Sequence, residues 1–405
     1  MAADARARRT LRTVLAITFL ASIGTGVYWH GLSFVARHAY GYEQVHTLVL
    51  YAVLGLLYAV AAFAAAGLVR RVACVASPRS VLASVLAAQC AVAPLPVLLP
   101  SELPLWISAA GVTVLSAVMW PLVESFLGSG LHGPDMRRAV SQFNLTWMPA
   151  VALPMFAMAP LVEHHATWTL AFVSVACGGA LLATPLLPTH PRPHDDAAAA
   201  GHVTDRYPAL LRCARTLLPV SYLLAAALSP IVPYRLAEVG VEPVWQTPAT
   251  ATWMLARVAA VGLMLALPSW HGRWGPLGLA ATALVGGFAL VVVGPSIASM
   301  LVGFAVFGAG LGVVYTAALY YALAVHRADV DAGGTHEALI GLGYGGGPLL
   351  ALVGVGLGGG PAIALVVAGT GLAAAAWAFT PWRAGRRRGS AGRIGGGDPG
   401  TGPTP

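Results

Sequence analysis

The chain is built from repeated apolar runs that are separated by short polar breaks. A run of about 20 apolar residues crosses the roughly 30 Å hydrocarbon core of a bilayer as one helix. Only 9% of the 405 residues are charged and 58% are hydrophobic, whereas soluble domains average about 25% charged residues. The pattern therefore predicts an all-α polytopic membrane protein and excludes an ordinary soluble fold.

The apolar runs form two sets of six, which predicts twelve transmembrane helices. The first set lies within residues 1–188 and the second within residues 215–382. Residues 189–214 are rich in Pro, His, Asp and Ala, a composition typical of a flexible cytoplasmic linker. Residues 383–405 are rich in Gly, Arg and Pro, and we expect a disordered cytoplasmic tail. The sequence thus predicts two pseudo-equivalent six-helix bundles.

The arginines mark one end of the predicted spans. All 23 basic residues are arginine, and 20 of them lie in breaks on the side that holds both termini. Because positively charged loops stay in the cytoplasm, we expect cytoplasmic N- and C-termini in a bacterial-type plasma (inner) membrane. Acidic residues occupy breaks on the other side, namely Glu43, Glu102, Glu163, Glu238 and Glu242.

Several kinds of site are not expected. The arginines are scattered over loops and tails, whereas nucleic-acid binding requires a basic face. The four cysteines lie far apart, and neither they nor the pair Asp195–Asp196 predicts a metal site. The run Gly308-x-Gly310-x-Gly312 lies inside an apolar segment with no strand before it, so it does not predict nucleotide binding. We expect no cofactor, no metal and no direct use of ATP.

Two polar turns carry a further signal. The turn after the second span contains Gly67, Arg70 and Arg71, and the turn after the eighth contains Arg273. With the six-plus-six layout and the fifth-span opening Phe143–Trp147, the chain resembles the major facilitator superfamily over about residues 11–382. That family usually has Gly-x-x-x-Asp-Arg/Lys-x-Gly-Arg/Lys in the first turn, and here the acidic residue is missing. The resemblance implies a transporter fold without enzyme activity, expected as a monomer, with a cytoplasmic gate turn formed by Gly67, Arg70, Arg71 and Arg273.

Arg257 is the charged residue that lies deepest in a predicted span. It falls near the middle of the eighth apolar run, where a charge costs at least about 2.5–3.5 kcal/mol. This cost predicts a cation in a central cavity that binds an anionic group of the substrate or pairs with a coupling carboxylate. The alternative is a structural arginine that binds backbone carbonyls or an internal acid.

Two acidic residues are candidates for proton coupling or gating. Glu124 lies near the inner end of the fourth span, and Glu337 opens the eleventh beside His336. Carboxylates and imidazoles exchange protons with water when their surroundings change, so these groups are expected to carry protons or to gate. Alternatively, Glu337 stabilises the positive end of its helix, with Thr335 as the cap.

Gln142 and Asn144 stand at the mouth of the fifth span. They are expected to hydrogen-bond to Glu124 or Glu337, or to serve as polar contacts between helices. We include both in the coupling or gating set.

Aromatic residues in the spans complete the predicted cavity. Some of their polar tips are expected to face a cavity, because those tips gain nothing from lipid, and others are expected to anchor the bilayer interface. The candidate cavity residues are Arg257, Trp253, Tyr28, His30, Tyr51, Trp147, Tyr315 and Tyr344. Glycines also crowd the eleventh span around Pro348, which predicts a moving element.

The combined pattern predicts a secondary active transporter that works by alternating access. We expect proton-coupled efflux of a small amphipathic or anionic organic compound. The alternative is an uptake symporter for a sugar or an organic acid. A polytopic membrane enzyme that acts on lipid is a remote alternative, because clustered acids or a metal set at one depth are lacking. The expected partners are the substrate, the bilayer and protons.

Overall fold

The computed structural model describes residues 2–382 except 73, 128, 130, 132, 192–205, 326–330 and 381. The described part is helical and contains no strand. Helices form because the bilayer core offers no water to the backbone, so each segment must satisfy its own N–H and C=O groups. The helices are α1 Ala2–Gly26, η1 Val27–Gly31, α2 Leu32–Tyr40, α3 Gln44–Val72, α4 Pro78–Val92, α5 Leu95–Leu98, α6 Glu102–Leu127, α7 Gly133–Met158, α8 Trp168–Ala183, η2 Thr184–Leu186, α9 Tyr207–Glu238, α10 Pro243–Ala266, η4 Pro268–Trp270, α11 Gly275–Val293, α12 Ile297–Val325, α13 Asp331–Gly358, α14 Gly360–Ile363, η5 Ala364–Ala368 and α15 Gly369–Ala378.

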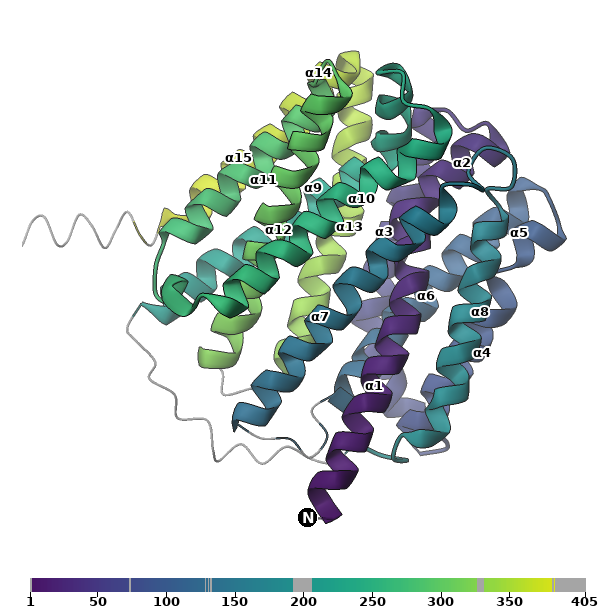
Figure 1. Ribbon diagram of the computed structural model, residues 1–405, viewed down its shortest axis with the longest axis vertical. Helices are drawn as coiled ribbons and strands as arrows, with labels where there is room; N and C mark the ends of the chain where they lie inside the picture. Colours follow the sequence, from purple (N-terminus) through teal and green to yellow (C-terminus); the bar gives the residue numbers. More distant parts are fainter. Residues whose placement is uncertain are drawn as a thin grey trace, which may run out of the picture.

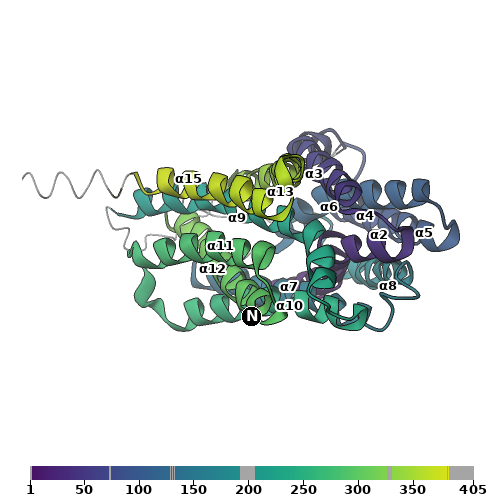
Figure 2. The same ribbon diagram turned by 90° about the horizontal axis from the view of Figure 1, so that it is seen from above.

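The helices gather into two bundles that lie side by side (Figure 1). Helices α1 to α8 contact mainly one another, and so do helices α9 to α15. Two pairs make the most extensive contacts between the bundles, α3 with α13 and α7 with α10 (Figure 2). In each pair the second long helix of one half meets the fifth long helix of the other, as two pseudo-equivalent halves require.

Eleven helices of the described part are long and apolar enough to cross a membrane. The predicted all-helical membrane protein is therefore confirmed. The segment expected as the fifth span is α7, whose 26 residues include Gln142, Asn144 and three prolines. These residues lower its hydropathy below that of the other spans. Helix α7 lies between α1 and α10, so much of its surface meets protein instead of lipid.

Two expected boundaries are wrong. Helix α9 begins at Tyr207, so residues 207–214 are helical and do not belong to the predicted linker. The Pro, His, Asp and Ala content of residues 189–214 predicted a linker, but Leu210 and Leu211 are buried and hold the segment in the core. Helix α13 begins at Asp331, so Thr335 does not cap it and Glu337 does not lie in its first turn. The predicted tail, 383–405, lies outside the described residues.

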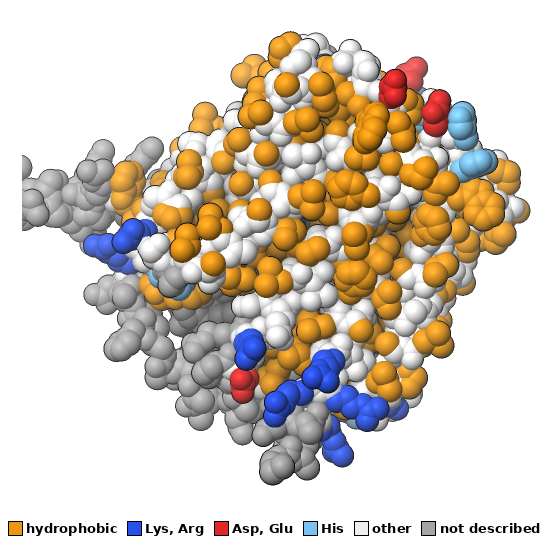
Figure 3. All heavy atoms as spheres, in the orientation of Figure 1, with side chains coloured by type: hydrophobic (Ala, Val, Ile, Leu, Met, Phe, Trp, Pro, Cys, Tyr) orange, Lys and Arg blue, Asp and Glu red, His pale blue; other side chains and the backbone are white. Residues whose placement is uncertain are grey.

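Charged side chains lie mainly at the two ends of an apolar surface (Figure 3). We call one end the arginine-rich end, where α1 begins with Arg6, Arg8, Arg9 and Arg12. The opposite end is the acidic end, where α9 ends at Glu238 and α10 follows Glu242.

Glycines set how closely α12 approaches its neighbours. A Cβ on Gly308 would clash with the carbonyl oxygen of Trp253 in α10. A Cβ on Gly312 would lie 2.7 Å from the Arg257 carbonyl oxygen, and one on Gly310 would lie 2.8 Å from a carbonyl oxygen of α11. The Gly-x-Gly-x-Gly run therefore packs one helix against two others and is not a nucleotide loop.

The glycines of α13 alternate between two neighbours in the same way. Gly341 and Gly345 face α3 of the first bundle, where their Cβ positions would lie 3.2 Å from Ala59 and Leu56 atoms. Gly343 and Gly347 face α9, against Pro219 and Leu223. Helix α13 thus contacts both bundles through small residues, and its predicted role as a moving element stays a prediction.

We predict that Gly308→Ala destabilises the protein, because the added methyl group meets backbone that cannot rotate away. Overpacking of this kind costs typically about 1–3 kcal/mol. Thermal unfolding of the purified protein should show a lower midpoint than wild type. Gly262→Ala on α10 is the matched control, since its Cβ position has no atom within 4 Å. Equal midpoints for the two variants would contradict the packing role of Gly308.

Candidate functional site

The first span changes its winding between α1 and α2. Residues Val27–Gly31 form a π-helical turn, and all five are buried. Such turns occur frequently at functional sites because they re-aim neighbouring side chains. His30 Nδ1 lies 3.1 Å from Ser229 Oγ of α9, and its ring meets Trp253 of α10 at 4.8 Å. The turn therefore carries His30 across to the second bundle.

Trp29, from the same turn, also reaches the second bundle. Its ring stacks on Tyr344 of α13 with centroids 4.0 Å apart and planes 10° apart. Tyr58 of α3 meets both rings edge-on. Tyr222 of α9 continues the group, 5.5 Å from Tyr344.

Two predicted cavity residues form hydrogen bonds with other residues of the first bundle. The Tyr28 hydroxyl lies 2.6 Å from Ser108 Oγ of α6. The Tyr51 hydroxyl accepts a hydrogen bond of 3.1 Å from the backbone N–H of Ser33. Both tyrosines are buried, and their hydroxyls hold helices of one bundle together.

Arg257 lies on α10 and is enclosed by aromatic rings. Its side chain is buried, with 6% exposure. Its Cζ atom lies 4.5 Å from the ring centroid of Trp147, 5.0 Å from that of Tyr315 and 5.7 Å from that of Tyr222. We call Arg257 and these three rings the Arg257 cluster. The first ring belongs to α7 of the first bundle, so the cluster spans the interface between the bundles.

The charge of Arg257 is only partly compensated. Nη2 donates a 3.0 Å hydrogen bond to the Tyr222 hydroxyl, and buried Nε has no partner. Within the described residues, the ion pairs join Arg235 to Glu238 and His164 to Glu163, and none includes Arg257. Each cation–π contact contributes about 0.5–2 kcal/mol, whereas burying an ion costs several kcal/mol. The guanidinium can therefore still bind an anion.

Asn144 of α7 orients two rings of the cluster. Its Oδ1 atom accepts a 3.0 Å hydrogen bond from Trp147 Nε1 and a 3.5 Å hydrogen bond from the Tyr315 hydroxyl. The sequence placed Asn144 in the coupling or gating set, and the structure brings it beside Arg257. Tyr222 was missed, because a lone tyrosine in an apolar run carries no motif.

No described contact joins the other coupling candidates to the cluster. Glu124 is partly buried near the end of α6, toward the arginine-rich end, and Gln142 is partly buried in α7. The side chains of His336 and Glu337 lie outside the described part of the chain. Their roles stay predictions.

The predicted gate turns lie at the arginine-rich end. Arg71 and Arg273 are exposed there, Gly67 is partly buried, and the Arg70 side chain is outside the described set. The second turn is anchored to α12, since Gly272 N–H donates a 3.1 Å hydrogen bond to the Tyr321 hydroxyl.

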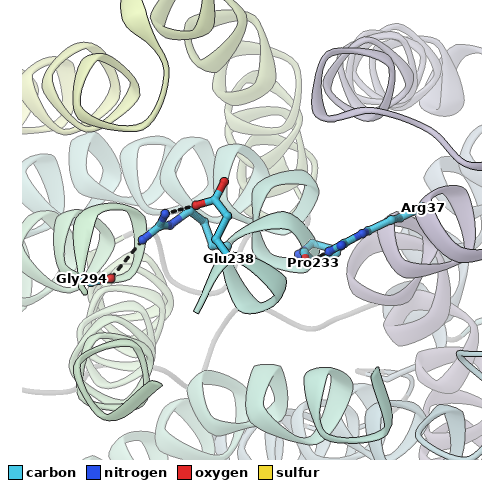
Figure 4. Close-up of polar contacts among 5 residues, drawn as sticks. Arg37, Pro233, Glu238 and Gly294 are labelled. Atoms are coloured by element: carbon cyan, nitrogen blue, oxygen red, sulfur yellow. Dashed lines mark hydrogen bonds and ion pairs between the residues drawn. The ribbon is translucent and has the colours of Figure 1, made fainter. Parts of the chain in front are cut away.

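At the acidic end, polar contacts join the two bundles. The Arg37 guanidinium of α2 donates to the Pro233 carbonyl oxygen of α9 (Figure 4) and lies 5.2 Å from the Tyr234 ring. The Tyr234 hydroxyl lies 2.6 Å from Thr47 Oγ1 and donates to the Tyr42 carbonyl oxygen at 2.6 Å. We call Arg37, Thr47 and Tyr234, with their partners, the acidic-end latch.

A second contact supports the latch. His38 Nε2 lies 3.3 Å from Gln246 Oε1 at the start of α10. Beside it, Arg235 pairs with Glu238 and donates to the Gly294 carbonyl oxygen within the second bundle (Figure 4). The described contacts therefore hold the acidic end closed.

Solved structures with this arrangement cover nearly the whole chain. The nucleoside transporter NupG matches with a TM-score of 0.66 and 12% identity, over 91% of this chain and 98% of its own. A POT family transporter in complex with 5-aminolevulinic acid matches with a TM-score of 0.69 and 10% identity, over 92% and 96%. The human organic anion transporter TETRAN matches with a TM-score of 0.59 and 15% identity, over 92% and 99%.

The chain has the major facilitator fold. The predicted fold is thus confirmed. No protein-family model and no curated protein matches the sequence. At 10–15% identity the likeness concerns the fold alone. In this fold the Arg257 cluster lies where the two bundles meet.

We predict that Tyr234→Phe opens the acidic end. The change removes two hydrogen bonds across the bundles, together worth about 1–3 kcal/mol, enough to shift a two-state equilibrium roughly 5–150-fold. Spin labels on Cys introduced at Val45 of α3 and Val244 of α10, both exposed, would report the distance between the bundles by pulsed electron resonance. The four native cysteines are replaced first.

Tyr40→Phe is the control for this measurement, because the Tyr40 hydroxyl is buried without a hydrogen-bond partner. It should leave the distance distribution unchanged. A latch role for Tyr234 is wrong if both variants keep the wild-type distribution.

Proposed function

We propose that the chain is a secondary active transporter that works by alternating access and binds its substrate at the Arg257 cluster. The observation that carries this proposal is a buried, partly compensated cation whose aromatic partners come from both bundles. A substrate bound there contacts both halves, so the rocking of one bundle against the other exposes it to either side. Neighbours in fold support this assignment, since they are named as transporters and not as enzymes.

The substrate in this proposal is a small amphipathic or anionic organic compound that leaves the cell. The negative group pairs with Arg257, and apolar parts pack on the rings. One neighbour in fold is named as an organic anion transporter, which agrees with this substrate class. Uptake of a sugar or organic acid is the alternative. Sealed vesicles of both orientations distinguish the two directions.

The proposed orientation places the arginine-rich end in the cytoplasm of a bacterial-type plasma membrane, with a monomeric, multi-pass chain. Positive charge retained on the cytoplasmic side supports this orientation. The acidic-end latch then lies on the outer side, and the proposed efflux carrier takes up its cargo from the inner side.

Protons are the proposed coupling ion. Glu124, partly buried in α6, is the described carboxylate assigned to this role, together with His336 and Glu337. Gln142 and Asn144 belong to the gating set in the same proposal. In this proposal the proton binds at these acidic and imidazole groups, and the substrate binds at the Arg257 cluster.

We predict that Arg257→Gln abolishes transport while expression and membrane insertion stay normal. A charged hydrogen-bond partner contributes about 1.5–3 kcal/mol, so affinity should fall roughly 10–100-fold. The cargo is first found by a thermal-shift ligand screen on purified protein, and its flux is then measured in proteoliposomes. Arg235→Gln is the control, because Arg235 contacts only the second bundle. Full flux through Arg257→Gln would remove the guanidinium from the mechanism.

We predict that a protonophore collapses concentrative transport and that Glu124→Gln weakens its response to a pH gradient. Neutralising the carboxylate removes a proton site while the side chain keeps its shape. The measurement is flux of the identified cargo in proteoliposomes with and without an imposed pH gradient. Glu163→Gln, an exposed acid at the acidic end, is the matched control. Flux indifferent to the protonophore would point to another ion or to facilitated diffusion.

A further inference from the structure

Trp147 covers Arg257 from the opposite bundle. Of the three rings around the guanidinium it lies nearest, at 4.5 Å, and it is only partly buried. The negative π face of an indole attracts a guanidinium but forms no hydrogen bond with it. A carboxylate satisfies the same guanidinium better, because two parallel N–H···O bonds match its planar fork. An arriving carboxylate therefore becomes the stronger partner of the cation and weakens its contact with the indole.

Two features show what else the ligand needs. Tyr315 lies 5.0 Å from the Arg257 Cζ atom and meets Trp147 nearly edge-on, at 5.5 Å and 70°. Asn144 is hydrogen-bonded to both rings, so they are held as a pair. When the indole leaves the guanidinium, its face needs a new partner. A flat aromatic ring provides one through offset or edge-to-face packing, which a puckered saturated ring does not.

Resting on the proposed function, we propose that the Arg257 cluster recognises a planar aromatic carboxylate and that Trp147 occupies the site in the empty carrier. The carboxylate binds the guanidinium edge that includes unpartnered Nε. The ring of the ligand packs against Trp147 and Tyr315. Because Trp147 and Arg257 come from different bundles, exchange of the indole for the ligand loosens one contact across the interface and replaces it with another.

Three matched probes test the recognition on wild-type protein. Benzoate has the charge and the ring, benzamide has the ring alone, and cyclohexanecarboxylate has the charge alone. Calorimetric titration of purified protein in nanodiscs should give benzoate at least about tenfold tighter than either analogue, a difference of about 1.4 kcal/mol. Equal affinity for benzamide overturns the anionic requirement, and equal affinity for cyclohexanecarboxylate overturns the aromatic one.

Variants then assign the two roles. Arg257→Lys keeps the charge but loses the fork, and it should weaken benzoate roughly tenfold or more while benzamide is unaffected. Benzoate should also change the indole fluorescence of wild type, and this change should be lost in Trp147→Phe but kept in Trp168→Phe. Trp168 is exposed at the start of α8. A full signal from Trp147→Phe overturns the displacement of Trp147.

Measuring both binding and flux distinguishes a failure of the proposed recognition from a failure of the proposed transporter function. Uridine, a neutral nucleoside, is titrated and assayed for flux in proteoliposomes beside benzoate. If uridine binds and crosses while benzoate does neither, the inference is wrong and the transporter function stands. If benzoate binds with the stated preferences, the inference on recognition holds. Lack of flux for every bound probe then counts against the transporter function alone.

Discussion

The structure depends on one buried charge that is shared between two bundles. Arg257 belongs to α10, yet its nearest aromatic partner is Trp147 of α7. The rings offset only part of the free-energy cost of burying the guanidinium, because a π face is a weaker partner than a carboxylate. In the proposed function, this contact across the interface is the one that the ligand replaces. An arginine in the same place whose N–H groups were all paired would also link the two bundles, but it would have no free donor for a substrate.

Close backbone packing lets this charge stay in place. Gly308 and Gly312 bring α12 against α10 on either side of the turn that carries Trp253 and Arg257. Gly341 and Gly345 allow the second interface, between α13 and α3. Small residues at such contacts permit close approach and leave little to interlock, which suits surfaces that slide. At the acidic end, the latch adds hydrogen bonds that are specific but few. The described contacts between the bundles are thus close packing of small residues together with a few hydrogen bonds.

Much of the fold and part of the site could be read from the sequence. Apolar runs predicted the helices, and the cost of a charge inside a span singled out Arg257 before any geometry was known. The predicted end of the linker was wrong because the Pro, His, Asp and Ala content of residues 189–214 suggested a loop, although helix α9 already begins at Tyr207 and its leucines there are buried. Tyr28 and Tyr51 were named for a cavity, yet their hydroxyls bond within the first bundle. Which way a ring points depends on helix rotation, and in a helix that is apolar all round no periodicity reveals it.

By itself, the sequence determined that this chain crosses a membrane many times, in two sets, with most of its arginines on one side. Those properties follow from hydrophobicity and charge, which each segment carries alone. Only the tertiary structure decided that Trp147, Tyr222 and Tyr315 surround Arg257, and that Asn144 joins them. These residues come from four helices of two bundles. Their meeting depends on how the bundles pack, and packing is a property of pairs of surfaces that no single segment encodes.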